Sequence, residues 1–179
     1  MLIKEEFLKS MVISILKRGG SNSIEAKVVA EHLILSNLTG HDSHGVGMLP
    51  TYFRMLKSKL LKPNQKPELF NVNGSIMMFD GKRGYGQSVG KIAMNRAIKK
   101  CKSTGLVLMT LRNTHHLGRI GTYGEQCIAE GLISLHFVNV TDHPPVVAPF
   151  NGSDARFNTN PICLAMPGTK KQPEIILDM

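Results

Sequence analysis

The sequence predicts a mixed α/β fold in which a helical N-terminal region, residues 1–66, precedes a mixed α/β domain, residues 67–179. Apolar residues recur at helical spacing through the first region. After the proline-punctuated segment 62–67, the pattern changes to short apolar runs that alternate with helical stretches. A composition of 42% hydrophobic and 20% charged residues is that of an ordinary globular chain, which excludes disordered and fibrous proteins.

Three helices are expected in the first region, from Phe7 to a glycine stop at Gly19, from Asn22 or Ser23 to near Gly40, and from about Val46 to Leu60. The side-chain oxygen of Asn22 or Ser23 can cap the second helix. Pro50 is compatible with the third helix because it falls in the first turn.

The second region is expected to hold two strands within Glu68–Asp80, a helix from about Gln87 to Ser103, a strand over Leu106–Leu111, a helix over Ile120–Glu130, a strand over Leu132–Asn139, and closing strands at Ile162–Met166 and from Glu174. Asn73-Gly74 predicts a type I′ hairpin turn, because both residues tolerate positive φ. Residues 140–161 carry four prolines and form a long loop, a kind of segment that is usually functional or disordered.

The charge of the chain favours anionic partners. Its 22 basic residues exceed its 13 acidic residues by nine, which suits nucleic acid, phosphate cofactors or carboxylate substrates. A nucleic-acid-binding protein would concentrate this charge and interleave aromatic residues, whereas here the excess is spread evenly and Trp is absent. A basic nucleic-acid-binding module is therefore the weakest alternative.

Cysteine usage and the N-terminus indicate the compartment. Cys101, Cys127 and Cys163 are odd in number and far apart, which argues against a disulfide framework and against a cysteine-based zinc site. Acidic residues stand where a signal peptide would be basic, and no run approaches the ~20 apolar residues of a membrane span. We expect a cytoplasmic protein that does not contact a membrane.

A glycine-rich segment invites comparison with phosphate-binding loops. Residues 84–90, Gly-Tyr-Gly-Gln-Ser-Val-Gly, resemble the dinucleotide fingerprint, but Val89 stands where the third glycine belongs. The hairpin expected before this segment is also the wrong context for a βαβ unit. A glycine turn that leads into a helix N-terminus is the favoured interpretation, and its backbone N–H groups could still bind an anion.

Histidine clusters carry the strongest chemical signal. Residues 41–45 are His-Asp-Ser-His-Gly and residues 115–118 are His-His-Leu-Gly, both at the ends of expected elements. We expect no metal site, because adjacent histidines do not easily bind one ion and the HExxH pattern is absent. A Ser43 nucleophile lacks the GxSxG elbow. General acid–base catalysis by histidine needs only a pKa near neutrality and reach to a substrate hydroxyl or carbonyl. It is therefore the chemistry that requires the fewest additional residues.

Four segments together resemble the malate/L-lactate dehydrogenase family, which includes ureidoglycolate and sulfolactate dehydrogenases. They are residues 40–50 (Gly-His-Asp-Ser-His-Gly-Val-Gly-Met-Leu-Pro), 115–118, 147–152 (Val-Ala-Pro-Phe-Asn-Gly) and 158–161 (Asn-Thr-Asn-Pro). The resemblance implies a homodimeric, NAD- or NADP-dependent oxidoreductase that transfers a hydride between nicotinamide and a small 2-hydroxy acid or 2-oxo acid. It also implies a fold unlike the Rossmann fold, with helices beside a mixed, largely antiparallel sheet, and makes residues 67–179 the cofactor-binding domain.

The resemblance assigns roles residue by residue. His116 matches the acid–base histidine that exchanges a proton with the substrate oxygen, and Ser43 and His44 match the catalytic pair that holds and orients the substrate. Thr159 would line the substrate cleft. The expected cofactor contacts are Asn139, Thr141, Asp142, Asn160, Pro161, Asp178 and Met179.

Two departures from the family pattern are visible. Several members have a substrate-binding arginine shortly after the first motif, where this chain has Met48, so Arg54 and Arg119 are the candidate substitutes. Family members also continue well past a segment like residues 177–179. We therefore expect the chain to be C-terminally incomplete, and an inactive remnant or fragment of such an enzyme is the main alternative.

Overall fold

The structure, a computed structural model, describes residues 3–140 and 144–179. The chain divides into two compact units, of which the first ends at Arg119 and the second begins at Ile120. The first unit combines helices with a three-stranded sheet and the second packs a helix on another, so the predicted mixed α/β class is confirmed. The functional division between residues 1–66 and 67–179 stays a prediction.

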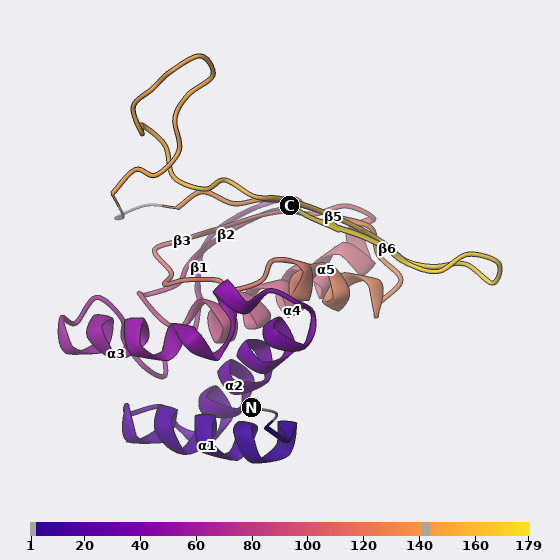
Figure 1. Cartoon of the computed structure of the whole chain (residues 1–179). Coiled ribbons are helices and arrows are strands. Elements are labelled where there is room, and N and C mark those ends of the chain that lie inside the picture. Colours follow the sequence, from indigo (N-terminus) through magenta and orange to yellow (C-terminus); the bar gives the residue numbers. More distant parts are fainter. Residues whose placement is uncertain (1–2, 141–143) are drawn as a thin grey trace. The chain divides into compact units, whose positions relative to one another are not determined.

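The first unit begins with the helices α1 (Glu5–Arg18), α2 (Ser23–Leu38) and α3 (Leu49–Lys57) (Figure 1). Asn22 caps α2, because its side-chain oxygen accepts hydrogen bonds from the backbone N–H groups of Ile24 at 3.0 Å and Glu25 at 2.9 Å. The third helix is shorter than predicted. Residues Val46–Met48 form a 3₁₀ turn, η2, so the α-helix starts only at Leu49 and ends at Lys57.

The sheet of the first unit has the order β1-β2-β3, with β1 (Glu68–Asn73) antiparallel to β2 (Ile76–Asp80). The predicted hairpin exists, but the predicted turn is wrong. Asn73 pairs with Ile76, so the turn residues are Gly74 and Ser75, and of these only Gly74 has a positive φ, of 57°. Positive φ at the first central residue alone is the pattern of a type II′ turn.

Strand β3 (Leu108–Arg112) runs parallel to β2, and α4 (Gly86–Thr104) connects the two. This β2-α4-β3 connection is a βαβ unit, so the expectation that the hairpin excludes that context was wrong. The hairpin pairs β1 with one edge of β2 and leaves the other edge free for β3. The glycine-rich segment therefore does connect a strand to a crossover helix.

Two clusters of apolar side chains hold the first unit together. In one, Met77 and Phe79 of β2 pack against Ala93 of α4. The other joins α1, α2 and α3 to the chain beyond them and consists of Val12, Leu16, Ala26, Val29, Ala30, Leu33, Tyr52, Leu61 and Tyr85. Tyr52 and Tyr85 are the largest of its fully buried members, and both carry a hydroxyl into this core.

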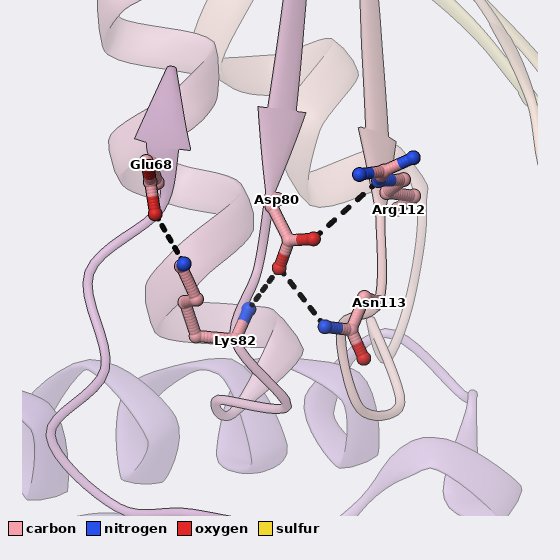
Figure 2. Close-up of polar contacts among 5 residues, drawn as sticks. All are labelled: Glu68, Asp80, Lys82, Arg112 and Asn113. Atoms are coloured by element: carbon pink, nitrogen blue, oxygen red, sulfur yellow. Dashed lines mark hydrogen bonds and ion pairs between the residues drawn. The ribbon is translucent and has the colours of Figure 1, made fainter. Parts of the chain in front are cut away.

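A polar network ties the loops that leave β2 and β3 (Figure 2). The Asp80 carboxylate accepts hydrogen bonds from the Lys82 backbone N–H and the Asn113 amide, both at 2.9 Å, and from Arg112 Nε at 3.4 Å. Lys82 also forms an ion pair with Glu68. Lys82 and Asn113 both have positive φ, a conformation that these side-chain contacts help to hold. The network therefore holds the chain just before the glycine-rich turn (residues 84–90) and just before the histidine segment (residues 115–118) at one end of the sheet.

The second unit packs α5 (Gly121–Ile128) on an antiparallel sheet of β4 (Ser134–Phe137), β5 (Ile162–Met166) and β6 (Ile175–Asp178), in that order. Three of the four strand pairings in the two sheets are antiparallel, which confirms a mixed, largely antiparallel architecture. Residues 144–161 form the expected loop, drawn in orange in Figure 1, with one isolated bridge between Val147 and Phe157.

Candidate functional site

The first unit brings the two predicted histidine clusters together. His44, from the 3₁₀ turn η1 (Asp42–His44), stacks on His116 from the segment after β3, with ring centroids 5.2 Å apart and an interplanar angle of 25°. Ser43 Oγ lies 2.9 Å from His44 Nδ1. The structure therefore places Ser43, His44 and His116 in one site, and their catalytic roles stay predictions.

Asn37 at the end of α2 positions the turn that carries Ser43 and His44. Its side-chain amide donates a hydrogen bond to the Asp42 carboxylate, and its side-chain oxygen accepts one from the Val46 backbone N–H at 2.9 Å. One amide thus ties both 3₁₀ turns to the helix before them. This contact explains why residues 42–48 form two short turns instead of extending α3.

The glycine-rich turn supports the histidine segment by backbone contact. The His115 backbone N–H donates to the Gly84 carbonyl at 3.0 Å, and the Arg83 N–H donates to the Asn113 carbonyl at 2.7 Å. A Cβ at Gly86 would lie 2.5 Å from the His115 carbonyl oxygen and closer still to that of His116. Glycine is therefore needed at residue 86 so that α4 can begin against the histidine segment, a role different from the anion site considered for this turn.

Sequence reasoning missed two residues, Tyr52 and Gln87. Tyr52 of α3 is 0% exposed, and its Oη lies 2.9 Å from His116 Nδ1. Gln87 in the first turn of α4 is also buried, and its Nε2 donates to Tyr52 Oη at 2.6 Å. Tyr52 lies 35 positions from Gln87 and 64 positions from His116, so no local pattern predicted these contacts.

Burial sets the protonation of the histidines. It lowers the pKa of His116 to about 4, with further lowering by His44 and His115, and it also lowers the pKa of His115. The pKa of the buried Tyr52 is raised well above its usual value of 10.0, chiefly by burial. At neutral pH, His116 is therefore a neutral imidazole beside a neutral phenol.

A further histidine, His32 of α2, interacts electrostatically with His44 and His116. Its pKa is lowered to about 3, first by burial and then by the nearby basic side chains of His116, Arg119, His44 and Lys91. A Cβ at Gly118 would overlap the His32 ring, so the chain packs directly on it. Arg119 and Lys91 are the cationic side chains of this group, and their charge makes this part of the first unit favourable for an anion.

The two candidate arginines differ in surroundings. Arg119 is 7% exposed and belongs to this basic group through its interaction with His32. Arg54 is exposed on α3, where it donates a hydrogen bond to Thr51 Oγ1 at 2.9 Å. Burial beside the histidines therefore favours Arg119 as the substrate-binding candidate.

The remaining predicted residues belong to the second unit. Asn139 follows β4 and Pro161 precedes β5, and the adjoining Val138 N–H donates to the Pro161 carbonyl at 3.1 Å. Thr159 and Asn160, just before Pro161, are exposed. Thr141 and Asp142 lie outside the described residues.

Asp178 and Met179 make contacts within the second unit. The Asp178 carboxylate accepts the Gly121 backbone N–H at 2.8 Å, and the Met179 N–H donates to the Ile162 carbonyl at 3.1 Å. Asp178 thus stabilises the start of α5. The Gly121 N–H is therefore already bonded to a carboxylate of the chain itself.

Metal-ligating side chains do not gather in the described part of the chain. Over residues 3–140 and 144–179, no group of three or more His, Cys, Asp or Glu side chains is arranged to hold a metal ion. None of the three cysteines forms a disulfide bond. The site itself contains imidazole, hydroxyl, amide and guanidinium groups.

Two solved dehydrogenase structures share this architecture. The chain superposes on sulfolactate dehydrogenase from Methanocaldococcus jannaschii with a TM-score of 0.92 at 35% identity, covering 100% of this chain and 51% of the other. The TM-score against malate dehydrogenase from Pyrococcus horikoshii OT3 is 0.91 at 34% identity, covering 100% of this chain and 50% of the other. The chain thus has the mixed α/β fold of malate and sulfolactate dehydrogenases.

Sequence comparison identifies the family within this class. A sequence model described as malate/L-lactate dehydrogenase matches residues 3–179, and the chain belongs to this family. It is 43% identical over 171 residues to hydroxycarboxylate dehydrogenase B of Escherichia coli (strain K12), covering 96% of this chain and 47% of that protein. The chain thus spans about half the length of the curated relatives it matches.

Proposed function

We propose that this chain carries the acid–base part of a NAD- or NADP-dependent oxidoreductase that interconverts a small 2-hydroxy acid and its 2-oxo acid. The observation that carries the proposal is the stacked His44–His116 pair, at 5.2 Å, in a chain of the malate/L-lactate dehydrogenase family. The relatives named above are dehydrogenases of hydroxycarboxylates, sulfolactate and malate, all of which share the 2-hydroxy acid group.

In this proposal His116 exchanges a proton with the substrate oxygen. Its low pKa, about 4, keeps the imidazole neutral at physiological pH, so one ring nitrogen can accept a proton and the other can donate one. Ser43 and His44 hydrogen-bond to the substrate and hold its oxygen near the His116 ring. Proximity of this kind is what converts a weak acid–base group into an effective one.

Arg119 binds the substrate carboxylate in this proposal. It takes the place of the arginine that several family members have at the position of Met48. Its burial supports the assignment, because a charge-assisted hydrogen bond is stronger away from water. The basic surroundings of His32 favour the same negatively charged group. Thr159, in the second unit, is proposed to contact the substrate through its hydroxyl.

The cofactor contacts are proposed for the second unit. Asn139, Asn160 and Pro161 present exposed amides and a rigid corner at neighbouring strand ends, which suits a nicotinamide dinucleotide. Thr141, Asp142 and the C-terminal Asp178-Met179 complete the proposed set. When bound, the cofactor supplies the hydride donor or acceptor for the substrate carbon.

The proposal extends to a homodimer in the cytoplasm. The family resemblance suggests the homodimer, and three cysteines without a disulfide bond suggest the cytoplasm. Among the described residues, no helix combines the length and the apolar composition that crossing a bilayer requires.

The function is tested with the purified 179-residue chain. NADH and NADPH are titrated separately while their fluorescence is followed, and then 2-oxo acids corresponding to lactate, malate and sulfolactate are added. We expect binding of one cofactor and its oxidation with at least one of these acids. Absence of binding at millimolar cofactor would contradict the proposal and favour an inactive fragment. Salt-dependent DNA binding instead would favour the nucleic-acid alternative.

A further inference from the structure

The contacts of Tyr52 determine how its hydroxyl proton is directed. Tyr52 Oη has two polar neighbours in the structure, Gln87 Nε2 at 2.6 Å and His116 Nδ1 at 2.9 Å. A phenol donates one hydrogen bond and accepts others. The Gln87 amide nitrogen can only donate, so it uses the acceptor capacity of Oη and leaves the hydroxyl proton for the other neighbour.

The hydroxyl proton therefore points at His116 Nδ1. A neutral imidazole that accepts at Nδ1 carries its own proton on Nε2. Because Nδ1 is engaged with Tyr52, Nε2 is the nitrogen left to meet a substrate oxygen. The direction of two hydrogen bonds in the core thus decides which nitrogen of His116 holds the proton.

We propose that Gln87 and Tyr52 are positioning residues for the proton step: Gln87 directs the Tyr52 hydroxyl proton to His116 Nδ1, which fixes the His116 proton on Nε2. The significance of this arrangement for turnover rests on the proposed function. The arrangement itself is a property of the folded chain and is measured without substrate or cofactor.

The Tyr52 hydroxyl can also supply His116 with a proton at Nδ1 when His116 gives up its proton from Nε2. As the oxygen of a 2-oxo acid becomes an alkoxide, the Nε2–H bond breaks and an O–H bond forms on the substrate. The Tyr52 O–H bond breaks and an Nδ1–H bond forms, so the imidazole stays neutral and the phenolate oxygen carries the negative charge. The Gln87 N–H, already directed at this oxygen, stabilises that charge until His116 takes up a proton at Nε2 and returns the Nδ1 proton to Tyr52.

The fold explains how Gln87 and Tyr52 come to lie beside His116. Gln87 lies in the first turn of α4, directly after Gly86, whose missing side chain lets the helix approach the histidine segment. Tyr52 projects from α3 into the core and is also packed by the rings of Tyr85 and His115, each with its centroid 5.6 Å away. Both side chains are fully buried, so water does not compete for these hydrogen bonds.

The test is nitrogen NMR of the histidine rings in the substrate-free chain near neutral pH, with His116 assigned by its loss in His116→Gln. We expect the His116 proton on Nε2 and a Nδ1 signal displaced by the Tyr52 hydrogen bond. Tyr52→Phe should abolish this displacement. Gln87→Met, which keeps the side-chain length and removes the amide, should weaken it, and this variant also serves if Tyr52→Phe does not fold.

Tyr85→Phe is the matched control. It removes another fully buried phenol hydroxyl beside Tyr52, and it should leave the His116 signals unchanged. A proton on His116 Nδ1 in the unsubstituted chain would overturn the proposal. The Gln87 amide would then be reversed, with its Oε1 accepting the Tyr52 hydroxyl proton. Equal His116 signals in the unsubstituted chain, Tyr52→Phe and Gln87→Met would overturn it as well.

Kinetics separate this inference from the proposed function. In Tyr52→Phe we expect kcat to fall on the order of tenfold, the equivalent of one ordinary hydrogen bond, with little change in the KM of the 2-oxo acid. The solvent deuterium isotope effect on kcat should rise. A chain with the expected NMR signals but no turnover would refute the function alone, whereas normal turnover in Tyr52→Phe would refute the proton role.

Discussion

Acidification should destabilise the fold through the buried His32. In the folded chain the pKa of His32 is about 3, whereas its ordinary value is 6.5. Between these two values the unfolded chain binds a proton that the folded chain does not. Stability therefore falls as the pH drops through this window and is fully present above it.

The size of the effect follows from these two pKa values. On lowering the pH from about 7.5 to about 5, the unfolded His32 becomes almost fully protonated while the folded His32 stays neutral. Linkage then gives a loss of about 2 kcal/mol in the free energy of unfolding. The neighbouring His116 contributes a loss of similar size, but the two interact and do not simply add.

The assay is urea unfolding followed by circular dichroism at both pH values, for the unsubstituted chain and for His32→Gln. The glutamine does not titrate, so the difference between the two pH dependences isolates His32. We expect the variant to lose about 2 kcal/mol less on acidification. Equal pH dependences in the two proteins would refute the conclusion that His32 is held neutral by burial.

Three further substitutions test other parts of the structure. Gly86→Ala should lower the free energy of unfolding by about 2–3 kcal/mol, because the new Cβ meets backbone carbonyls, whereas Gly47→Ala, in open space, should change it by less than about 0.5 kcal/mol. Asp178→Ala should cost about 1 kcal/mol, seen as a lower midpoint of thermal unfolding, because α5 loses its N-terminal carboxylate; an unchanged midpoint would contradict this role. Arg119→Met should raise the KM of the 2-oxo acid at least about tenfold, whereas Arg54→Met should not, and equal KM values in both variants would refute the choice between them.

The helices were predictable because their signals are local. The start of α2 follows from Asn22, and the first turn of α3 tolerates Pro50 as expected. The predicted start of α3 was wrong because the observed start depends on Asn37, which holds residues 42–48 in two 3₁₀ turns. Nothing in that segment's own pattern shows such a contact.

Strand pairing and the turns around the site depend on distant contacts. The parallel pairing of β2 with β3 joins residues separated by α4, so the local hairpin signal could not predict it. Gly86 was noticed as part of a phosphate-loop pattern, yet its role is to admit the backbone of the histidine segment. A glycine pattern in sequence does not say whether a ligand or the chain itself occupies the space.

The candidate site was predicted in part. Ser43, His44 and His116 stood out because polar and titratable residues cluster beside glycine at element ends. Tyr52 and Gln87 did not, because a tyrosine and a glutamine on buried helix faces resemble ordinary core residues until the partner is known. The direction of their hydrogen bonds depends on α3, α4 and the histidine segment meeting in the fold.

The central claim, that His116 exchanges a proton with a 2-hydroxy acid or 2-oxo acid, is tested most directly by His116→Ala. Cofactor oxidation by a 2-oxo acid is compared in the unsubstituted chain and the variant, together with cofactor binding. The account predicts that turnover falls by about a hundredfold or more while cofactor affinity is nearly unchanged. Turnover retained in His116→Ala would contradict it.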